Sequence, residues 1–485
     1  MDEYIKRVIG QGDEGSELLA KITAPTLKNT PFVQVLEHGK NGLAVLRSPK
    51  DYDIIVHSAS GDPNLDDLAA HSSSLVDRLV EQANTIGASP VAFANVVDSY
   101  EGENPMLEVI GNALAKAADK YQLAIMNGEN AILGARVNPD IQANVSGTMI
   151  SLVPNNSTIA FKNMLNYQGV NYARFDPHGQ AILINSDGIG TKTEFYERAL
   201  LYHLGINDFM AMNLDDTIKL GARARIISGV VETKGDIPVE LIQKHLADTS
   251  RPMGIIGILQ HEVAGDRIRG FNDTSPSYNV SGSVVSVIDE ARLCSPLRPF
   301  EDDYLVAIRG LPNPRSNGIT DKRKIMVELF GEDWHLTDKG KYFLEFLAQP
   351  STILYPIFKD LIDASLATSV YHMSGGAYNG KLARPIAKHD LFVEIPGPFQ
   401  TLFQPDEKEV ELMKALTTSV TDAYQKWPMG NDGFITTHNP DMAIELIRRH
   451  GLEARVVGQL QKDDKGRTGV ELTSYNGVKI YFSGK

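Results

Sequence analysis

An internal repeat is the feature of this sequence that most constrains its fold, because a duplicated segment must build the same unit twice. The tetrapeptide Asn144–Gly147 (Asn-Val-Ser-Gly) returns 135 residues later as Asn279–Gly282, and both copies run into alternating apolar residues. Upstream, Ile86–Ala88 and Val96–Asp98 each have a similar counterpart 134 residues later. A nearly constant offset across about a hundred residues indicates two homologous α+β units.

The repeat divides the chain into four parts. We expect a first, degenerate repeat at 35–155 and a second repeat at 156–295, preceded by an arm or short helix at 1–34. The pattern changes at 296–485, where Tyr304–Ile308 begins a third α+β domain. In that domain we predict helices from Asp321 to Gly331, at 351–365 and at 407–425, and strands at 391–395, 454–459 and 478–482.

Composition excludes several classes of protein. The chain has 47 Lys and Arg against 61 Asp and Glu, a formal charge of −14, so neither nucleic-acid binding nor a polybasic membrane anchor is expected. No stretch approaches the ~18 apolar residues of a membrane span, and the first residues do not form a signal peptide. The single cysteine, Cys294, rules out an intrachain disulfide. We therefore expect a globular cytoplasmic protein.

The sharpest local signal is Ile184–Lys192, an apolar strand that ends in Asp187 and a Gly-Ile-Gly-Thr-Lys turn. Glycines let the backbone approach a ligand closely and offer amide donors, which suits an anion. Lys192 adds a positive charge, and Asp187 offers the oxygen ligands that a hard divalent cation prefers. The segment predicts a nucleotide-phosphate site; a plain β-turn with a surface lysine is the alternative.

A second acidic signal is the adjacent pair Asp215 and Asp216, which interrupts an otherwise apolar helix start. Two neighbouring carboxylates among apolar residues are costly unless they are solvated or bound to a cation. Magnesium ligation explains the pair, and an N-capping acidic pair on a surface helix is the alternative.

Three further segments follow predicted strands. Arg315–Gly318 precedes a helix, whose N-terminal amides suit an anion, although a helix cap with a turn glycine explains it equally well. His372–Ala377 places a histidine before a Ser-Gly-Gly loop, where it could bind substrate, transfer a proton or serve the structure. Met429–Phe434 is compatible with a simple hairpin turn.

These segments and their order along the chain resemble those of the aminoimidazole ribonucleotide synthetase family, the phosphoribosylformylglycinamidine cyclo-ligases. That family has an Asp-Gly-(Val/Ile)-Gly-Thr-Lys turn, an Asn-Asp pair ahead of Gly-Ala, a Ser-Asn-Gly helix start and a His-x-(Ser/Thr)-Gly-Gly-Gly loop. Here Asp187–Lys192 match the turn in full, and Asp216 lies five residues before a Gly-Ala pair. Ser316–Gly318 and His372–Gly376 match the other two motifs, so the resemblance covers about 180–460.

The resemblance implies ATP-dependent ring closure of formylglycinamidine ribonucleotide in purine biosynthesis, with ATP and Mg²⁺ as cofactors. ATP phosphorylates the formyl oxygen, a substrate nitrogen attacks that carbon, and phosphate leaves. By this resemblance the catalytic residues are Asp187, Lys192 and His372, and the magnesium ligands are Asp187, Asp215 and Asp216. The residues expected to hold ATP or the ribonucleotide are Gly188, Ile189, Gly190, Thr191, Lys192, Ser316, Asn317, Gly318, Ser374, Gly375, Gly376 and Glu129.

The resemblance also implies a fold: tandem N-terminal domains that form a pseudo-dimeric β-barrel with flanking helices, followed by an α+β C-terminal domain. The second repeat lacks the family's Gly-Gly-Glu-Thr, whereas the first has Asn127–Asn130 (Asn-Gly-Glu-Asn). We therefore expect one composite ATP site at 187–192, completed by Glu129, in a monomer or a homodimer. The alternative is that the first repeat is only a scaffold and Glu129 a surface residue.

Two departures from the family keep other functions open. Asp215 replaces the family's Asn, and Ala377 replaces the last Gly of the histidine loop. The chain could therefore be another small-molecule kinase or phosphoryl-activating enzyme of the same ATP-binding superfamily, or a nucleotide-binding protein without catalysis.

Overall fold

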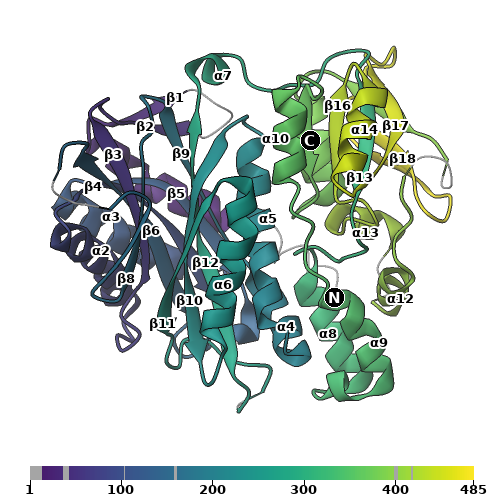
Figure 1. Cartoon of the computed structure of the whole chain (residues 1–485). Helices are drawn as coiled ribbons and strands as arrows, with labels where there is room; N and C mark the ends of the chain where they lie inside the picture. The colour runs from purple at the N-terminus through teal and green to yellow at the C-terminus, as the bar shows by residue number, and fades with distance from the viewer. Residues whose placement is uncertain are drawn as a thin grey trace. The chain divides into compact units, whose positions relative to one another are not determined.

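The computed structural model describes residues 14–36, 43–102, 104–157, 161–272, 274–397, 402–416 and 419–484. It divides the chain into two compact units, which we describe separately (Figure 1). Unit 1 comprises the chain up to Phe209 together with Ala222–Leu293, and unit 2 comprises Met210–Gly221 together with Cys294–Lys485. The boundary near residue 294 lies close to the predicted domain boundary. The assignment of Met210–Gly221 to unit 2 was not predicted.

Unit 1 is built on two six-stranded mixed sheets. The first has the order β5-β4-β6-β3-β8-β7 and the second the order β11-β10-β12-β9-β2-β1. The strands of the first sheet are β3 (Tyr52–Ser60), β4 (Ser89–Ser99), β5 (Ala124–Ile132), β6 (Ala143–Pro154), β7 (Met164–Tyr167) and β8 (Val170–Phe175). Those of the second are β1 (Val33–Leu36), β2 (Leu43–Arg47), β9 (Ala181–Gly188), β10 (Arg223–Lys234), β11 (Ile256–Val263) and β12 (Ser277–Ile288).

The two sheets have the same topology at every step. In each, the two outermost strands on one side are parallel (β4 with β5, β10 with β11), and the other neighbours are antiparallel. The equivalent bulges are also present, between Pro90 and Ala92 on β4 and between Ala224 and Ile226 on β10. This agreement supports the interpretation as a repeat, which remains a prediction, as does closure of the sheets into a barrel.

Each sheet takes its outer hairpin from the other half of unit 1. The hairpin β1–β2 precedes β3 in the chain but pairs with β9, through Leu46 opposite Ile182. The hairpin β7–β8 precedes β9 but pairs with β3, through Ala173 opposite Val56. Because a strand ladder fixes both partners along its length, this exchange ties the halves together.

The sheets pack on each other through β-branched side chains. Ile54 and Ile150 of the first sheet share one buried cluster with Ile184, Ile226 and Val285 of the second. Every residue of β12, and every residue of β6 except the last, is buried. Strands that are covered on both faces have near-continuous runs of apolar or small residues, and β6 and β12 have such sequences.

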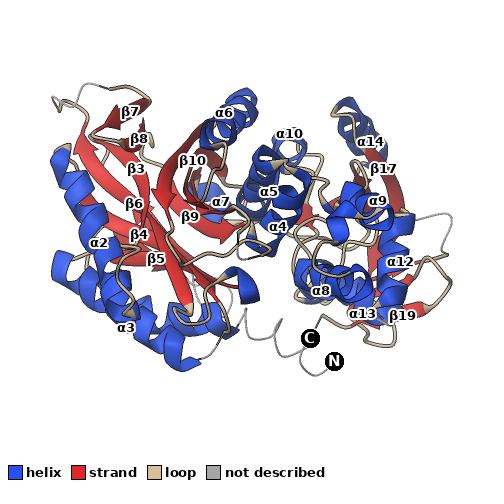
Figure 2. Ribbon diagram, turned by 90° about the horizontal axis from the view of Figure 1, so that it is seen from below, coloured by secondary structure: helices blue, strands red, loops and turns tan. Residues whose placement is uncertain are grey.

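Helices cover the outer faces of the sheets in unit 1. Helices α2 (Leu68–Thr85) and α3 (Asn104–Tyr121) lie side by side on the first sheet (Figure 2). Asp67 begins α2, because its carboxylate accepts a hydrogen bond from the Ala70 amide. The buried side chains of both helices join Phe93 and Met149 in a second core. On the second sheet, α6 (Val239–Ser250) packs on β11.

The predicted arm lies partly outside the described residues. Residues 14–23 are helical and are followed by a single 3₁₀ turn at Ala24–Lys28. Leu19 is buried in the core beneath α2 and α3. This segment is therefore part of unit 1.

Unit 2 is built on one seven-stranded sheet with the order β14-β16-β13-β17-β15-β18-β19. Its strands are β13 (Tyr304–Arg309), β14 (Ser369–His372), β15 (Phe392–Ile395), β16 (Gly433–Thr437), β17 (Glu453–Gln461), β18 (Gly469–Thr473) and β19 (Lys479–Phe482). The described α-helices after β13 are α8 (Ile319–Phe330), α9 (Asp338–Leu347), α10 (Tyr355–Asp363), α11 (Arg384–Ala387), α12 (Glu407–Ala415), α13 (Val420–Lys426) and α14 (Pro440–Arg449).

The predictions for unit 2 match these elements in part. Strands β15, β17 and β19 and helices α8 and α10 lie where the sequence predicts them, whereas the helix predicted at 407–425 is two helices, α12 and α13. Strands β16 and β18 and helices α9 and α14 were missed, whereas β14 is the strand predicted before the His372 loop. None of the described helices in either unit is long and apolar enough to cross a membrane.

Candidate functional site

The predicted phosphate turn follows a central strand of unit 1. Strand β9 ends at Gly188, a single 3₁₀ turn covers Gly190–Lys192, and α4 (Thr193–Ala199) follows directly. Gly190 has φ +69°, the left-handed region that favours glycine, so the second glycine of the motif is required by the turn itself. The strand and the tight turn are the geometry that the sequence predicted, and the helix α4 after them was not predicted.

Several donors of this turn already have partners inside the protein. The amide of Gly188 donates to Asp187 Oδ1 at 2.7 Å, and the amide of Ile189 donates to the Val280 carbonyl at 3.0 Å. Both Ile189 and Thr191 are buried. Phosphate binding by the Gly188 and Ile189 amides therefore requires these internal bonds to be exchanged.

Lys192 is a buried ion-pair residue rather than a surface lysine. Its side chain is fully buried, and its ammonium donates to Asp208 Oδ1 at 2.8 Å. The Tyr196 hydroxyl donates to the other Asp208 oxygen. Burial and the Asp208 charge raise the pKa of Tyr196, which keeps the hydroxyl a donor. In this conformation Lys192 neutralises Asp208, a partner that the sequence analysis missed.

Glu129 lies on β5, opposite Val96 in the parallel ladder with β4, and is half-buried. Partial exposure is compatible both with a role in the site and with the alternative, a surface residue. A contribution of Glu129 to nucleotide binding remains a prediction.

A buried cluster of two carboxylates and two amides, missed in the sequence analysis, joins the halves of unit 1. Asn144 Nδ2 donates to both oxygens of Glu232 at 2.7 Å, and Asn279 Nδ2 donates to Asp98 Oδ2 at 2.7 Å. Burial, Glu232 and Asp187 raise the pKa of Asp98 to about 8, against the opposing hydrogen bond from Asn279. The signal was present, because these residues belong to the repeated segments.

Asp215 is an anchor inside unit 2. The residue is completely buried, and its Oδ1 accepts hydrogen bonds from the amides of Leu354 at 2.9 Å and Tyr355 at 2.8 Å. Its Oδ2 lies 3.2 Å from Arg315 Nη2. Burial raises the pKa of Asp215 to about 7, and Arg315 opposes the shift. The carboxylate thus satisfies the N-terminal amides of α10, so both oxygens are engaged without a metal.

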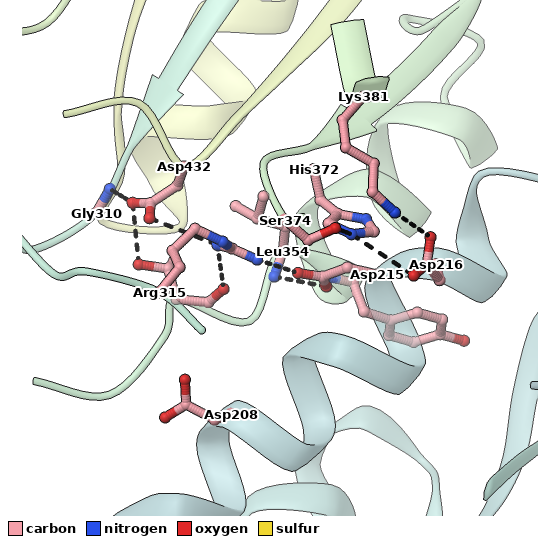
Figure 3. A network of polar contacts seen from close by, with 12 residues as sticks. Asp208, Asp215, Asp216, Gly310, Arg315, Leu354, His372, Ser374, Lys381 and Asp432 are labelled. Atoms are coloured by element: carbon pink, nitrogen blue, oxygen red, sulfur yellow. Dashed lines mark hydrogen bonds and ion pairs between the residues drawn. The ribbon is translucent and has the colours of Figure 1, made fainter. Parts of the chain in front are cut away.

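Asp216, next in the chain, faces cationic and imidazole groups (Figure 3). Asp216 lies on α5 (Gly205–Ile218) and pairs with Lys219, the residue directly after that helix. It also pairs with Lys381 at 3.6 Å. His372 Nε2 lies 3.7 Å from Asp216 Oδ2. Burial opposes ionisation, but Lys219, Lys381 and His372 together lower the pKa of Asp216 well below its usual range. Asp216 is therefore ionised, and its single negative charge faces the positive charges of two lysines.

His372 is neutral and lies at the end of β14. Burial lowers the pKa of His372 well below its usual value, with Asp216 opposing the shift, and its side chain is completely buried. Nε2 shares a hydrogen bond of 2.7 Å with Ser374 Oγ. Among the described residues Nδ1 has no hydrogen-bond partner. A buried unpaired ring nitrogen is costly, which marks His372 as a group whose polar capacity is not used up by the fold.

The loop that follows His372 is partly open and partly strained. Gly375 is exposed, and a Cβ there would meet no atom within 4 Å, so a ligand could approach the backbone closely. Gly376 has φ +82°. Ala377, which replaces a glycine of the family, has φ +37° and ψ −124°, a conformation that a Cβ disfavours.

The Arg315–Gly318 turn is held by two carboxylates of unit 2. Arg315 is 1% exposed, lies between Asp215 and Asp432 and is 3.5 Å from Asp432 Oδ1 (Figure 3). Asn317 is 2% exposed, and neither its amide oxygen nor its nitrogen has a hydrogen-bond partner among the described residues. Gly318 has φ +59°, and a Cβ there would lie 2.0 Å from Trp427 Nε1. Ser316 directly precedes Asn317 and is half-buried.

Asp432 links several loops and was missed as a functional candidate, although its segment was singled out. Its carboxylate accepts hydrogen bonds from the Gly310 amide at 2.7 Å, Asn313 Nδ2 at 3.0 Å and Thr352 Oγ1 at 3.1 Å. Met429–Phe434 is thus the connection that leads into β16, not a simple hairpin turn.

The predicted site residues fall into two groups. Unit 1 holds Asp187–Lys192 and Glu129, and unit 2 holds Asp215, Asp216, Ser316–Gly318, His372 and Ser374–Gly376. Within the described parts of the chain, no three His, Cys, Asp or Glu side chains are arranged to hold a metal ion.

Both units are mixed α/β structures. Comparisons with the sequences of known proteins and with solved structures show what this chain is similar to. The phosphoribosylformylglycinamidine cyclo-ligase of Thermococcus kodakarensis is 22% identical over 305 residues, which cover 62% of this chain and 83% of that protein. That of Thermoplasma volcanium is 25% identical over 323 residues, which cover 65% and 89%. No family model matches the sequence. The chain is thus similar to the aminoimidazole ribonucleotide synthetase family, which confirms the resemblance seen in its motifs.

Solved structures align with this chain at low similarity. The hydrogenase maturation protein HypE of E. coli aligns over 63% of this chain and 85% of its own, with a TM-score of 0.39 and 14% identity. Phosphoribosylformylglycinamidine synthase II of Thermotoga maritima aligns over 66% of this chain, with a TM-score of 0.37 and 13% identity. This chain spans 45% of that synthase.

Proposed function

We propose that this protein is an ATP-dependent cyclo-ligase that converts formylglycinamidine ribonucleotide to aminoimidazole ribonucleotide, with ADP and phosphate as the other products. The observation that carries the proposal is the group formed by Asp216, Lys381, His372 and Ser374 beside an open glycine loop in unit 2. Of these, Asp216, His372 and Ser374 are positions that match the family motifs. The similarity to the named cyclo-ligases over most of their length supports the same activity.

In this proposal the charges of the group bind the ribonucleotide. Lys219 and Lys381 together exceed the charge of Asp216 by one, which favours an anionic oxygen of the substrate at this place. The Gly375 backbone is open to a ligand, and Asn317 offers a buried amide whose donor and acceptor are both unused. Burial of these groups strengthens each interaction, because little water competes for them.

His372 is suited to positioning or accepting a proton. Because burial keeps its ring neutral, one nitrogen is an acceptor and the other a donor, and the bond to Ser374 Oγ holds the ring in place. A substrate nitrogen that loses a proton as it attacks carbon needs such an acceptor. We propose this role for His372 in the cyclisation step.

The cofactors that the resemblance implies are ATP and Mg²⁺. When bound, ATP supplies the phosphoryl group that activates the formyl oxygen. We propose that it binds at the Asp187–Lys192 turn, with the first repeat as partner and Glu129 as a contributor. Phosphate binding there requires the Lys192–Asp208 pair and the internal hydrogen bonds of the Gly188 and Ile189 amides to be exchanged for bonds to the phosphate. Since the described residues do not form a metal cluster, we derive no step through Mg²⁺.

A second function is favoured by one departure from the family. Ala377 has a strained conformation where the family has glycine, which changes the loop that would hold the substrate. A phosphoryl-activating enzyme with another small substrate is therefore the second candidate. It predicts phosphate release without formation of the imidazole.

The test is a steady-state assay of the purified protein with ATP, Mg²⁺ and formylglycinamidine ribonucleotide. Phosphate and the diazotisable aminoimidazole product are measured together, and the proposal expects equal amounts of both. His372→Gln should lower turnover at least 100-fold, because glutamine cannot accept the proton. Asp266→Asn, a change of an exposed carboxylate in unit 1, is the control and should leave turnover unchanged. Phosphate alone would favour the second candidate, and neither product would reject both.

A further inference from the structure

A cavity in unit 1 lies at the opposite end of the strands from the predicted phosphate turn. Its volume is about 770 Å³, and residues at the starts of β3, β10 and β11 and at the end of β8 line it. Strands β9 and β10 run in the same direction, because both pair antiparallel with β12, and Gly188 before the turn is level with Val230. The cavity is therefore separate from the turn, and its volume suits a small organic ligand.

Arg225 on β10 brings an uncompensated positive charge to this cavity. The residue is partly buried, and no hydrogen bond or ion pair engages its side chain among the described residues. Of its three side-chain nitrogens only Nε is both buried and unpartnered, so the two terminal nitrogens keep accessible surface. A partly desolvated guanidinium without an acceptor is costly, and an anion that reaches its terminal nitrogens would offset that cost.

The backbone at Arg225 forms a β-bulge. The register of the ladder with β12 shifts between Ala224 and Ile226, so Arg225 is the extra residue. Such a bulge changes the direction in which a side chain points. At the equivalent bulge on β4 the extra residue is Val91, which is 6% exposed and belongs to the core. The two halves of unit 1 thus differ here, with a core residue in one and an unpaired arginine in the other.

The corresponding place beside β4 is covered by the N-terminal segment. The 3₁₀ turn Ala24–Lys28 packs on β5, and the Ile125 amide at the start of that strand donates to Thr26 Oγ1 at 3.0 Å. Strand β11 pairs with β10 as β5 pairs with β4, so the start of β11 is the equivalent position. There Ile256 lines the cavity instead.

Lys162 is a second cation of the cavity wall. It is exposed and has no ion pair among the described residues. Arg174, also on the wall, donates to Asp53 Oδ2 at 2.6 Å, so these two charges compensate each other. Asp176 accepts a hydrogen bond from the His178 amide at 2.7 Å and lies 3.0 Å from His178 Nδ1. Three cationic side chains thus face two carboxylates that already have donors, which favours an anionic ligand although the chain has a formal charge of −14.

The wall also offers groups that suit the body of a ligand. Phe161 and Phe175 line the cavity and are partly exposed, so a planar ring can pack on an aromatic side chain. Asn155 and Asn163 are exposed on the same wall, and a side-chain amide can both donate and accept hydrogen bonds. Aromatic and amide groups beside two unpaired cations suit a ligand that combines a planar ring with an anionic group.

We propose that this cavity binds a phosphate monoester that carries a planar ring, with its phosphate on Arg225 and Lys162. A guanidinium suits a phosphate because two of its N–H groups can donate side by side to two phosphate oxygens. The lysine adds a second positive charge for the dianion. The site is independent of the proposed cyclo-ligase activity, since none of the residues assigned to that activity lines the cavity.

The test is isothermal titration calorimetry of the full chain with phenyl phosphate as the probe. Inorganic phosphate lacks the ring and phenol lacks the charge, so each should bind at least tenfold more weakly than phenyl phosphate, which should saturate one site. Arg225→Gln should weaken phenyl phosphate binding at least tenfold. Lys234→Gln, on the same strand but outside the cavity lining, makes the same change of charge and is the matched control, which should bind as the unchanged protein does.

A second variant keeps the test decisive if Arg225→Gln fails to fold. Lys162 is exposed, so Lys162→Gln should fold normally and weaken phenyl phosphate binding several-fold. The proposal would be overturned by no binding of phenyl phosphate, by equal binding of phenol or inorganic phosphate, or by binding that these variants leave unchanged. Because the titration contains neither ATP nor the ribonucleotide, its failure would leave the cyclo-ligase proposal standing, and the reverse is also true.

Discussion

The Asn144 amide on β6 donates to both carboxylate oxygens of Glu232 on β10, at 2.7 Å each. Its counterpart in the repeated tetrapeptide, Asn279 on β12, donates to Asp98 on β4, the counterpart of Glu232. Each asparagine thus binds the acidic residue of the other half of unit 1. On the same strands, Ser146 and Ser281 share a hydrogen bond of 2.6 Å. The repeat in the sequence corresponds to a reciprocal set of buried polar contacts.

These contacts predict a pH-dependent stability that Asp98 controls. In the folded protein the pKa of Asp98 is about 8, above its ordinary value of 3.8, so the native state binds the proton more tightly than the unfolded state. Its contribution is fully present below pH 4 and is lost as the pH rises through 8. Asp98→Asn should therefore raise the free energy of unfolding at pH 9 by about 1–3 kcal/mol and change it little at pH 4.

Urea unfolding of both proteins at pH 4, 7 and 9 measures this effect. Asp266→Asn, which changes an exposed carboxylate, is the control and should follow the unchanged protein at every pH. A parallel loss of stability in Asp98→Asn at all three pH values would contradict a protonated Asp98.

The Lys192–Asp208 pair predicts a large stability effect at a residue that the family resemblance assigns to catalysis. Lys192→Met leaves the Asp208 carboxylate buried and without its cation, so it should lower the free energy of unfolding by about 3–5 kcal/mol. The double variant Lys192→Met, Asp208→Leu removes both charges and should recover at least half of that loss. A Lys192→Met protein with unchanged stability would show that Lys192 is not held in the interior.

The neighbours Asp215 and Asp216 should separate stability from function. Asp215→Asn replaces an acceptor of two backbone amides and the partner of Arg315, so it should destabilise the protein by about 1–3 kcal/mol. Asp216 has a 20% exposed side chain, and Asp216→Asn should change stability by less than about 1 kcal/mol. Thermal unfolding measures the first effect. The assay of the proposed reaction measures the second, where Asp216→Asn should lower turnover at least 100-fold. The reverse pattern would contradict this division of roles.

Ala377 offers a test of strain in the loop after His372. Its φ of +37° is in a region that a Cβ disfavours, so Ala377→Gly should relieve about 1 kcal/mol of strain, less the greater entropy of glycine in the unfolded chain. We expect an unchanged or higher melting temperature by calorimetry. Ala387→Gly, in the short helix α11, is the control and should lower it. A clear loss of stability in Ala377→Gly would show that the methyl group is needed there.

Many of the helices and strands of unit 2 could be predicted from the local pattern of the sequence. The helix after Arg315–Gly318 and the strands at β15, β17 and β19 lie where periodicity and turn residues predict them. The strand predicted before the His372 loop is β14, whereas β16 was missed because five buried residues have no distinct period. Strand β14 ends at His372 and β16 begins after Asp432, so the pattern identified both residues but only one of the two strands that hold them.

The sequence by itself determined the mixed α/β class and the motifs that resemble the cyclo-ligase family, and it predicted the repeat, because these depend on residue order and spacing alone. Tertiary structure alone decided which groups are paired: Lys192 with Asp208, Asp215 with Arg315 and the α10 amides, and Asn144 with Glu232. Local spacing cannot predict such pairs, because their partners lie on other strands and helices and are brought together only when the sheets pack. Burial then sets their charge states, since a carboxylate far from water ionises only where a cation or an amide replaces the solvent.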